Sequence, residues 1–487
     1  MQSPKRWLDR RRGLSVTAHD SPLQVLRWGP TTALVVLVVV CGGVAAMWLL
    51  GVWSVPGTPT EADKLRLDRI KTALTVAAGL AAGVTLLLTL RRQMLSERGQ
   101  RFAESEALEQ RTTALYVAAA EQLGSDKAAV RLAGLYALER LGQDNPKLRQ
   151  TVVDVWCAYL RMPYIPPTDV LTRNSERSPD RPSDNPQPPD AVLESERREE
   201  LQVRLTAQRL LAAHTSGDLA EAGEATYWLG HRNKHIVIDL VGAVLVDFAL
   251  ATCRVGRCNL SGAQFHGDAH LTEAQFHGDA YLNGAQFHGK VNLSKAQSHC
   301  DAHLSEAQFR GGVFLAGVQF RGDVYLDEAQ FHGGAFLEKT QFHGDAYLRA
   351  ARFYGGAHLI GTQFHREADL SEAQFHEAAN LSETQFHNDA NLDAVKVRGA
   401  AFMLATQFHS AASLRDMQFH GDAYLNGAQF SRLADLSGSS ATSKAILPKG
   451  WKLSDDAESV EGLFPVISAM DAASVPVDGA GGSAAPR

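Results

Sequence analysis

Two apolar runs near the start of the chain are long enough to form membrane helices. Residues 31–53 contain no charged side chain, and residues 71–90 contain only Lys71 before their apolar stretch. About 20 apolar residues cross the hydrocarbon core of a bilayer as a helix. The first run is longer than the apolar part of a signal peptide and a second run follows closely. The pattern therefore predicts an N-terminal transmembrane helical hairpin.

The distribution of Lys and Arg predicts how this hairpin is oriented. Residues 1–30 form a basic segment, and the residues after the second run include four arginines between 91 and 101. The cations of the loop at 54–70 are partly balanced by acidic residues. Loops rich in Lys and Arg stay in the cytoplasm. We therefore expect a cell-membrane protein with two spans, an external loop at 54–70, and both termini in the cytoplasm.

Residues 91–162 have apolar side chains at helical spacing and are expected to form a cytoplasmic helical domain. Gly124 predicts the end of one helix, and Asn145-Pro146 predicts the start of another. The paired helices fit either a partner-binding hairpin of HEAT type or, as we favour, a small packing domain beside the membrane. Residues 163–189 hold eight prolines and are expected to form an extended linker.

Residues 236–438 are repetitive, and the segments on either side of them are expected to cover the two ends of the structure that the repeats form. The N-terminal segment, residues 190–235, begins with a helix capped by Asp190 and includes Tyr227 and Trp228. Residues 439–487 include Leu447–Trp451, our candidate for the C-terminal cover, and then a tail at 467–487 that we expect to be disordered. Open strand edges would otherwise pair with other chains, so both covers are needed.

Residues 236–438 are built on one short period. Apolar residues recur every five positions from Leu240 to Phe265. From Phe265 the rhythm becomes five plus six, so that a Phe register runs from 265 through 276 and 287 to 430, and a Leu register from 271 to 436. Of the 16 positions in the Phe register 14 are Phe, the exceptions being Ser298 and Val397, and Met403 alone departs from the Leu register. Such a long regular period is typical of a solenoid.

The motif Ala-(Asp/Asn)-Leu-x-x, as in ADLSE at 368–372 and ANLSE at 379–383, identifies a family resemblance. The repeat resembles the pentapeptide-repeat proteins, which implies an all-β, right-handed, quadrilateral β-helix with the large residue and the small residue two places before it pointing inward. The order of membrane spans, helical region and repeats also resembles membrane-anchored members of this family from actinobacteria.

The 11-residue double repeat departs from the family, because a four-sided coil then takes 22 positions and not 20. The additional residue follows a glycine, as in Phe265-His266-Gly267-Asp268, and we expect that glycine to have a positive φ at a widened corner. Thr340, Thr362, Thr384 and Thr406 recur in every second repeat, as expected for a stacked ladder. Roughly nine coils rising about 4.8 Å each predict a rod about 43 Å long.

Eleven of the 18 histidines directly follow the Phe register and are expected to form two outward columns on opposite sides. They are His266, His277, His288, His299, His332, His343, His365, His376, His387, His409 and His420. A pH-responsive or metal-binding surface is one interpretation. We favour the other, repeated duplication of a tolerated surface residue. Cys253 and Cys258 occupy the small inward position, so we expect them to pack in the core.

Composition narrows the function classes. The net charge is −6, and the five cysteines form no CxxC pair. The chain has no recognisable nucleophile, phosphate-binding or dinucleotide motif, so we predict no enzyme activity, no catalytic, cofactor-binding or metal-binding residues, and no cofactor. We predict a membrane-anchored, non-catalytic scaffold whose partners are the lipid bilayer and an unidentified cytoplasmic protein.

Two alternatives to the scaffold function stay open. Some soluble members of the pentapeptide-repeat family imitate duplex DNA and bind DNA gyrase, which needs a strongly acidic rod. Residues 236–440 hold 22 acidic and 14 basic side chains, a net charge of only −8. We therefore keep gyrase binding as the alternative and expect no nucleic-acid partner. The pH- or metal-responsive histidine surface is the second alternative. Members of the family also pair end to end, so a homo-oligomer is a possible state of the chain, although the segment 439–487 follows the repeat here.

Overall fold

The computed structural model describes residues 59–175, 191–217, 227–230, 234–432, 434–454 and 463–468, together with eight single residues between 36 and 48. The chain divides into two compact units, residues 1–111 and residues 112–487. The second unit holds both a group of helices and the repeats, so residues 112–162 belong with the solenoid and not with a separate helical domain.

The first long element is helix α2, Pro59–Leu123. It ends where predicted, since the Gly124 amide donates to the carbonyls of Ala120 and Glu121 at 3.2 and 3.1 Å. The helix already includes residues 59–70, which we had expected to form a loop. It also continues past residue 90 without a break. Its part from Ile70 onward is the one helix of the described residues long and apolar enough to cross a membrane.

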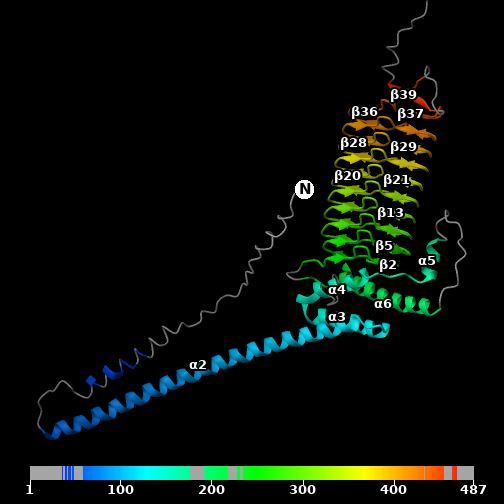
Figure 1. Cartoon of the computed structure of the whole chain (residues 1–487). Helices are drawn as coiled ribbons and strands as arrows, with labels where there is room; N and C mark the ends of the chain where they lie inside the picture. Colours follow the sequence, from blue (N-terminus) through cyan, green and yellow to red (C-terminus); the bar gives the residue numbers. More distant parts are fainter. Residues whose placement is uncertain are drawn as a thin grey trace, which may run out of the picture. The chain divides into compact units, whose positions relative to one another are not determined.

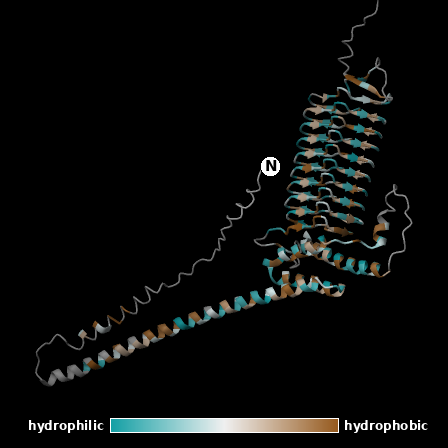
Figure 2. Ribbon diagram, viewed as in Figure 1, coloured by the Kyte–Doolittle hydropathy of each residue, from teal (hydrophilic) through white to brown (hydrophobic). Residues whose placement is uncertain are grey.

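The expected hairpin is not seen among the described residues. Its first span, residues 31–53, lies mostly outside them, and the single residues described there, such as Val44 and Trp48, are helical and exposed. Within α2, the apolar side chains of Leu74, Leu86 and Leu88 are 65%, 61% and 58% exposed. Figure 2 colours this part of the ribbon by its hydropathy.

Four further helices and one short 3-10 helix complete the described helical part of the second unit. They are α3 (Ala128–Asp144), η2 (Pro146–Leu148), α4 (Arg149–Arg161), α5 (Thr168–Ser175) and α6 (Ala191–Thr215). Pro146 begins η2, as the sequence predicts, but the Asn145 side chain caps the preceding helix by donating to the Leu141 carbonyl at 3.1 Å. Helices α3, α4 and α6 pack against one another around Leu135, Trp156 and Leu211, which are fully buried.

The helices cover the N-terminal end of the solenoid. The Gln150 side chain of α4 accepts from the Val237 amide at 2.9 Å and donates to the Val237 carbonyl at 2.8 Å. Gln208 of α6 donates to the Val246 carbonyl at 3.0 Å. These bonds satisfy backbone groups that an uncovered strand edge would leave open. The predicted N-terminal cover therefore includes α4 as well as the helix at 191–215.

The prediction of an extended linker at 163–189 is wrong for its first part. Residues 168–175 form α5, which contacts strand β5 (Gln264–His266). The Thr168 amide donates to the Glu194 carboxylate at 2.8 Å, and Tyr164 lies under the guanidinium of Arg204 at 4.4 Å. These long-range contacts offset the low apolar content that indicated a linker. The part of the predicted linker from residue 176 to 189 lies outside the described residues.

The repeats form a solenoid of four parallel sheets, one for each side of the coil (Figure 1). We name the sheets C, D, E and F; the chain visits them in the order D, E, F, C, as in β5 (Gln264–His266), β6 (Ala269–His270), β7 (Gln275–Phe276) and β8 (Ala280–Tyr281). Sheets D and F are therefore opposite each other, as are sheets C and E.

The strands of the solenoid are two or three residues long, and each side of a coil holds one strand. The remaining strands, by sheet, are as follows. Sheet C holds β1 (Ile238–Asp239), β4 (Cys258–Asn259), β12 (Ala302–His303), β16 (Val324–Tyr325), β20 (Ala346–Tyr347), β24 (Ala368–Asp369), β28 (Ala390–Asn391), β32 (Ala412–Ser413) and β36 (Ala434–Asp435). Sheet D holds β2 (Val244–Val246), β9 (Gln286–Phe287), β13 (Gln308–Phe309), β17 (Gln330–Phe331), β21 (Arg352–Phe353), β25 (Gln374–Phe375), β29 (Lys396–Val397), β33 (Gln418–Phe419) and β37 (Ser440–Ala441). Sheet E holds β10 (Val291–Asn292), β14 (Val313–Phe314), β18 (Ala335–Phe336), β22 (Ala357–His358), β26 (Ala379–Asn380), β30 (Ala401–Phe402) and β34 (Ala423–Tyr424). Sheet F holds β3 (Arg254–Val255), β11 (Gln297–Ser298), β15 (Gln319–Phe320), β19 (Gln341–Phe342), β23 (Gln363–Phe364), β27 (Gln385–Phe386), β31 (Gln407–Phe408) and β35 (Gln429–Phe430).

The register confirms the predicted wide coil and locates its beginning. Ile238 pairs with Cys258, as in a plain five-residue rhythm on four sides. Arg254 pairs with Gln275, one position further on than that rhythm would give. From Cys258, which pairs with Ala280, each step has the wider spacing of two double repeats. The coil thus widens at the position where the sequence period changes.

The interior is a stack of identical side chains. In the described residues every position of the Phe register is buried except Phe430, and every position of the Leu register except Leu293. Phe342 stacks between Phe320 and Phe364 with ring centroids 5.2 and 4.8 Å apart. The four threonines form the predicted ladder, and each hydroxyl donates to a Leu carbonyl of the preceding coil, at 2.8 Å from Thr340 to Leu315.

The reason for the glycines at the widened corners differs from the expected one. Of those glycines only Gly267 has a positive φ, of 82°. Gly333 is needed for a close approach, because a Cβ there would lie 2.5 Å from the carbonyl carbon of Gly311 in the preceding coil. Positive φ occurs instead two residues after each Leu, for example at Glu306 with 60° and Gly317 with 67°.

The C-terminal end is covered by an antiparallel hairpin. Strand β39 (Phe464–Ser468) pairs with β38 (Trp451–Leu453) and also with β37 (Ser440–Ala441), the last strand of sheet D. Trp451, in the predicted C-terminal cover, packs against the core. Residues 467 and 468, expected to belong to a disordered tail, are in β39, and the tail from residue 469 lies outside the described residues.

Candidate interaction surface

Sheets D and F carry the histidines in outward columns, as predicted. The rings of His343 and His365 are 4.6 Å apart, those of His365 and His387 4.9 Å, and those of His387 and His409 5.0 Å. These are the spacings expected for equivalent residues of neighbouring coils. The columns are interrupted where the sequence has Arg310, Arg321, Tyr354, Arg398 and Ser431.

His266 departs from the outward prediction because it is buried, with 7% of its surface exposed. It belongs to β5, against which α5 packs, so the N-terminal cover encloses the first ring of this column. Burial is the main cause that lowers the pKa of His266. Burial, followed by the neighbouring His266 and Arg310, lowers the pKa of His288 to about 4.

Sheets C and E carry two further outward columns that sequence reasoning missed. On sheet C, Tyr281, His303, Tyr325 and Tyr347 stack with centroids 4.7, 4.8 and 5.2 Å apart. On sheet E, Phe314 stacks on Phe336 at 5.0 Å, and Phe336 stacks on His358 at 5.1 Å. The signal was present as aromatic residues that recur in every second repeat, directly before the Leu register.

The two opposite faces differ in charge. On the sheet C side, the segments 278–285, 300–307, 322–329, 344–351, 366–373, 388–395 and 410–417 hold 13 acidic and three basic residues, a net charge of −10. On the sheet E side, the seven segments 267–274, 289–296, 311–318, 333–340, 355–362, 377–384 and 399–406 hold five acidic and three basic residues, a net charge of −2. The three central ones, 311–318, 333–340 and 355–362, hold only Glu338 and Lys339. The solenoid therefore presents an acidic face with tyrosines on sheet C. The central part of sheet E, residues 311–318, 333–340 and 355–362, has phenylalanines and no net charge, and we call it the uncharged sheet E face.

The acidic residues of the sheet C face also serve the fold. At the widened corner, the Asp301 carboxylate accepts from the Asp323 amide at 2.9 Å, and the Asp323 carboxylate accepts from the Asp345 amide at 2.9 Å. At these two corners the side chain of the additional residue thus binds the backbone of the next coil. Asp279 accepts from the Tyr281 hydroxyl at 3.1 Å, and that bond is the main cause that raises the pKa of Tyr281.

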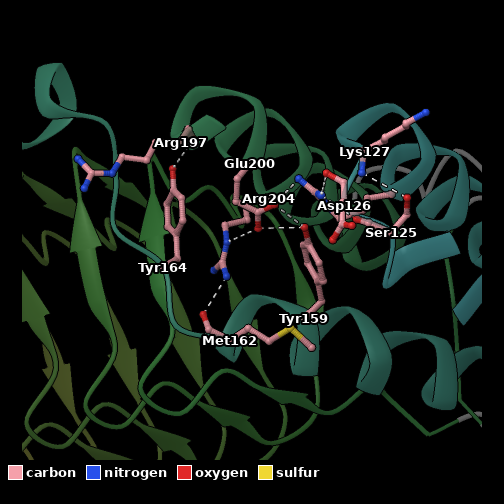
Figure 3. A network of polar contacts seen from close by, with 10 residues as sticks. Ser125, Asp126, Lys127, Tyr159, Met162, Tyr164, Arg197, Glu200 and Arg204 are labelled. Atoms are coloured by element: carbon pink, nitrogen blue, oxygen red, sulfur yellow. Dashed lines mark hydrogen bonds and ion pairs between the residues drawn. The ribbon is translucent and has the colours of Figure 1, made fainter. Parts of the chain in front are cut away.

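A second concentration of polar groups lies among the helices of the cover (Figure 3). Arg204, 3% exposed, donates to Glu200 at 2.8 Å and to the carbonyls of Leu160 and Met162 at 3.0 and 2.8 Å. Glu200 also accepts from the Tyr159 hydroxyl at 2.7 Å and pairs with Arg131 at 3.0 Å. Burial and the Glu200 bond raise the pKa of Tyr159. The network joins α3, α4 and α6 through these bonds.

Cys253 and Cys258 are buried free thiols, as predicted, with 0% and 1% of their surface exposed. Burial raises the pKa of Cys253 to about 12. Within the part of the chain that the structure describes, no group of three or more His, Cys, Asp or Glu side chains is arranged to hold a metal ion. The predictions of no catalytic, cofactor-binding or metal-binding residue stay predictions.

The Phe column of sheet D has one gap, at Val397, and that of sheet F has one at Ser298. A small apolar space lies beside Val397, lined by Leu381, Val395, Met403 and Met417 among others. Three of these residues are larger or more flexible than their equivalents, since Ala or Thr is usual at 395 and 417 and Leu at 403. Flexible methionines fill irregular space well, so the neighbours largely compensate for the missing ring.

Comparison with known families supports the repeat assignment. A family model described as pentapeptide repeats (9 copies) matches residues 260–308, 304–352 and 348–396. No curated protein and no solved structure matches the chain. The matched residues lie within the solenoid and contain the uncharged sheet E face and the histidine columns as far as His387.

Proposed function

We propose that this pentapeptide-repeat chain is a membrane-anchored, non-catalytic scaffold whose solenoid binds a cytoplasmic protein. The anchoring rests on α2, whose apolar residues between 70 and 90 are exposed, with Leu74 and Leu86 at 65% and 61%. Such a continuous apolar surface is costly in water and favourable in lipid. The arginines at 91, 92 and 101 are exposed directly after it, as in helices that end on the cytoplasmic side.

We further propose that residues 31–53 form a second span, so that residues 54–58 and the start of α2 face outward. Reporter fusions to the full chain test this topology. Fusions after residues 30 and 95 should report the cytoplasm, and a fusion at residue 58 should report the outside. An external signal at residue 95 would contradict the proposal and place the solenoid on the other side of the membrane.

The observation that carries the scaffold proposal is that the solenoid interior is filled while its outside presents four regular columns. The uncharged sheet E face is the best candidate for protein contact, because protein interfaces are depleted in charge and enriched in aromatic residues at their centre. Phe314 and Phe336 are partly exposed there, beside glycines at 312 and 334 that leave the ring edges accessible.

A matched pair of variants tests this face. Phe314→Ser with Phe336→Ser alters the sheet E column, and Tyr325→Ser with Tyr347→Ser alters the equivalent column of sheet C. Affinity capture with the full chain from solubilised membranes should recover proteins that bind the wild type and the sheet C variant but not the sheet E variant. Equal capture by both variants, with both folded by circular dichroism, would contradict the proposal.

The acidic face gives specific support to a second candidate, the DNA-mimicking gyrase-binding protein. Its charge of −10 lies along one side of the rod, although the rod as a whole is only mildly acidic. The test is inhibition of gyrase supercoiling by the full chain in detergent micelles at low salt. Inhibition that disappears when Asp301, Asp323 and Asp345 are changed to Asn would favour this candidate, and no inhibition would exclude it.

A further inference from the structure

The histidine column on sheet F begins with a ring that does not belong to the repeat. His235 lies in the segment that leads from the N-terminal cover to β1. Its ring stacks on that of His277, with centroids 3.9 Å apart and an interplanar angle of 5°. His277 in turn stacks on His299 at 4.7 Å. We call His235, His277 and His299 the histidine stack; it joins the cover to the second and third coils, counted along sheet F.

Gly256 provides the space for this arrangement. Val255 pairs with Phe276, so Gly256 occupies the ladder position one coil before His277. It has no side chain, and a Cβ there would lie 3.1 and 3.3 Å from the carbonyl oxygens of His235 and Ile236. The Gly256 amide donates to the Ile236 carbonyl at 2.7 Å. His235 therefore fills the place that a side chain of the repeat would otherwise take.

The surroundings of the stack favour neutral imidazoles. The Tyr227 hydroxyl lies 3.2 Å from Nδ1 of His235, and Nε2 of His277 is buried with no hydrogen-bond partner among the described residues. Arg254 lies close enough to act on both rings, and the nearest carboxylate along the coil, Asp279, already accepts from Tyr281. The other titratable groups around the stack are Lys234, Cys253, Cys300, Asp301 and Arg321.

The pKa values of all three histidines in the stack are lowered. Burial is the largest cause for all three rings; with His235, His299 and Arg254 as neighbours, it lowers the pKa of His277 to about 4. Burial with Arg254 and His299 lowers the pKa of His235, and burial with Arg321 lowers that of His299. A histidine whose pKa is lowered by folding stabilises the folded state above its unfolded pKa of about 6.5 and loses that contribution as the pH falls.

We propose that the histidine stack is a pH-sensitive junction that holds the N-terminal cover on the first coils at neutral pH and releases it on acidification. Protonation would place two or three positive charges on rings whose centroids are 3.9 and 4.7 Å apart, next to Arg254 and with no acceptor for His277 Nε2 among the described residues. Residues 227–230 and 234–235 would then separate from the first coils, while β1 (Ile238–Asp239) and the interior of the solenoid stay packed. This inference does not depend on the scaffold or on membrane anchoring.

Amide hydrogen exchange of the full chain in detergent micelles tests the junction. After correction for intrinsic rates, exchange in residues 227–230 and 234–235 should be at least about tenfold faster at about pH 5 than at about pH 7.5. Amides around Phe342 in the middle of the solenoid should change little. No acceleration in residues 227–230 and 234–235, or an equal acceleration throughout the solenoid, would overturn the proposal.

Two variants separate charge from packing. His277→Phe keeps a stacked ring and removes the central of the three titrating groups, so the acceleration at low pH should become much smaller. His409→Phe, at the other end of the same column, should leave the acceleration as in the wild type. Gly256→Ala should increase exchange in residues 227–230 and 234–235 already at neutral pH, because the added Cβ displaces His235. An acceleration of wild-type size in His277→Phe would contradict the proposal even if the Gly256 variant does not fold.

Discussion

Gly311 lies against Gly289 of the preceding coil so closely that a Cβ on Gly311 would overlap the Gly289 carbonyl group. The next residue, Gly312, is free of this restriction, because a Cβ there would only meet the Phe314 ring at 3.4 Å. Gly311→Ala should therefore force the two coils apart and lower the free energy of unfolding by about 1–3 kcal/mol. Gly312→Ala should change it by no more than about 0.5 kcal/mol.

Thermal unfolding of the full chain in detergent micelles, followed by circular dichroism, checks this pair. Both variants replace a glycine at neighbouring positions of one corner, so effects on the unfolded chain are similar and largely cancel. A loss of stability of the same size in both variants would mean that the close approach of the coils is not what requires glycine at this corner.

The inward and outward assignment of the strands is tested at two adjacent positions. Phe342 is 1% exposed and lies between two stacked rings, so Phe342→Asp would bury a carboxylate with no partner and should prevent folding of the middle coils. His343 is exposed, and His343→Asp should change the free energy of unfolding by less than about 0.5 kcal/mol. Melting curves of the two variants that coincide would contradict the assignment.

The parts of the fold that follow from repetition were predictable from the sequence. The Phe of each double repeat and the Thr of every second one already determine which residues stack, since equivalent side chains of neighbouring coils must lie side by side. The two-faced charge distribution follows from the same register. The outward columns of sheets C and E were missed because Tyr281, His303 and Phe314 do not share one residue type, although they share a position.

The parts that depend on single long-range contacts were not predictable. Nothing in the local sequence indicates that the Gln150 side chain pairs with the backbone of Val237, and this pair decides that α4 covers the solenoid. Similarly, the prolines of residues 163–167 indicate an extended chain, but the stacking of Tyr164 on Arg204 orders it. The reason for glycine at the widened corners also lies in a neighbouring coil and not in the local turn.

Acid should destabilise the solenoid through the histidine columns. Burial, as the largest cause, lowers the pKa of His288, His365, His376 and His387 among others, that of His288 to about 4. Unfolded chains bind these protons near pH 6.5, so the unfolded state binds more protons than the folded state as the pH falls from about 6.5 to 4. The free energy of unfolding should therefore fall through this window.

Denaturant unfolding of the full chain at several pH values measures this effect. His288→Phe should reduce the dependence on pH, because it keeps a stacked ring and removes one titrating group. His420→Phe, on an exposed ring of the same sheet, serves as the matched control. If the free energy of unfolding of the wild type stays constant or rises as the pH falls from 6.5 to 4, the fold does not lower the pKa of the histidines in the columns.

The polar network around Glu200 holds the cover together. Arg204 is 3% exposed, and Glu200 is the carboxylate that compensates its charge, at 2.8 Å. Glu200→Gln leaves two guanidinium groups, Arg204 and Arg131, without their partner, and breaking a buried pair from one side typically costs about 3–5 kcal/mol. Glu199→Gln, on the exposed neighbour, should cost less than about 0.5 kcal/mol. Trp156 and Trp228 are fully buried in the cover. In a chain that keeps only these two of its seven tryptophans, fluorescence reports the unfolding of the cover separately from the circular dichroism of the strands. An early fluorescence transition in Glu200→Gln alone would confirm that the network stabilises the cover, and transitions unchanged from the wild type would contradict it.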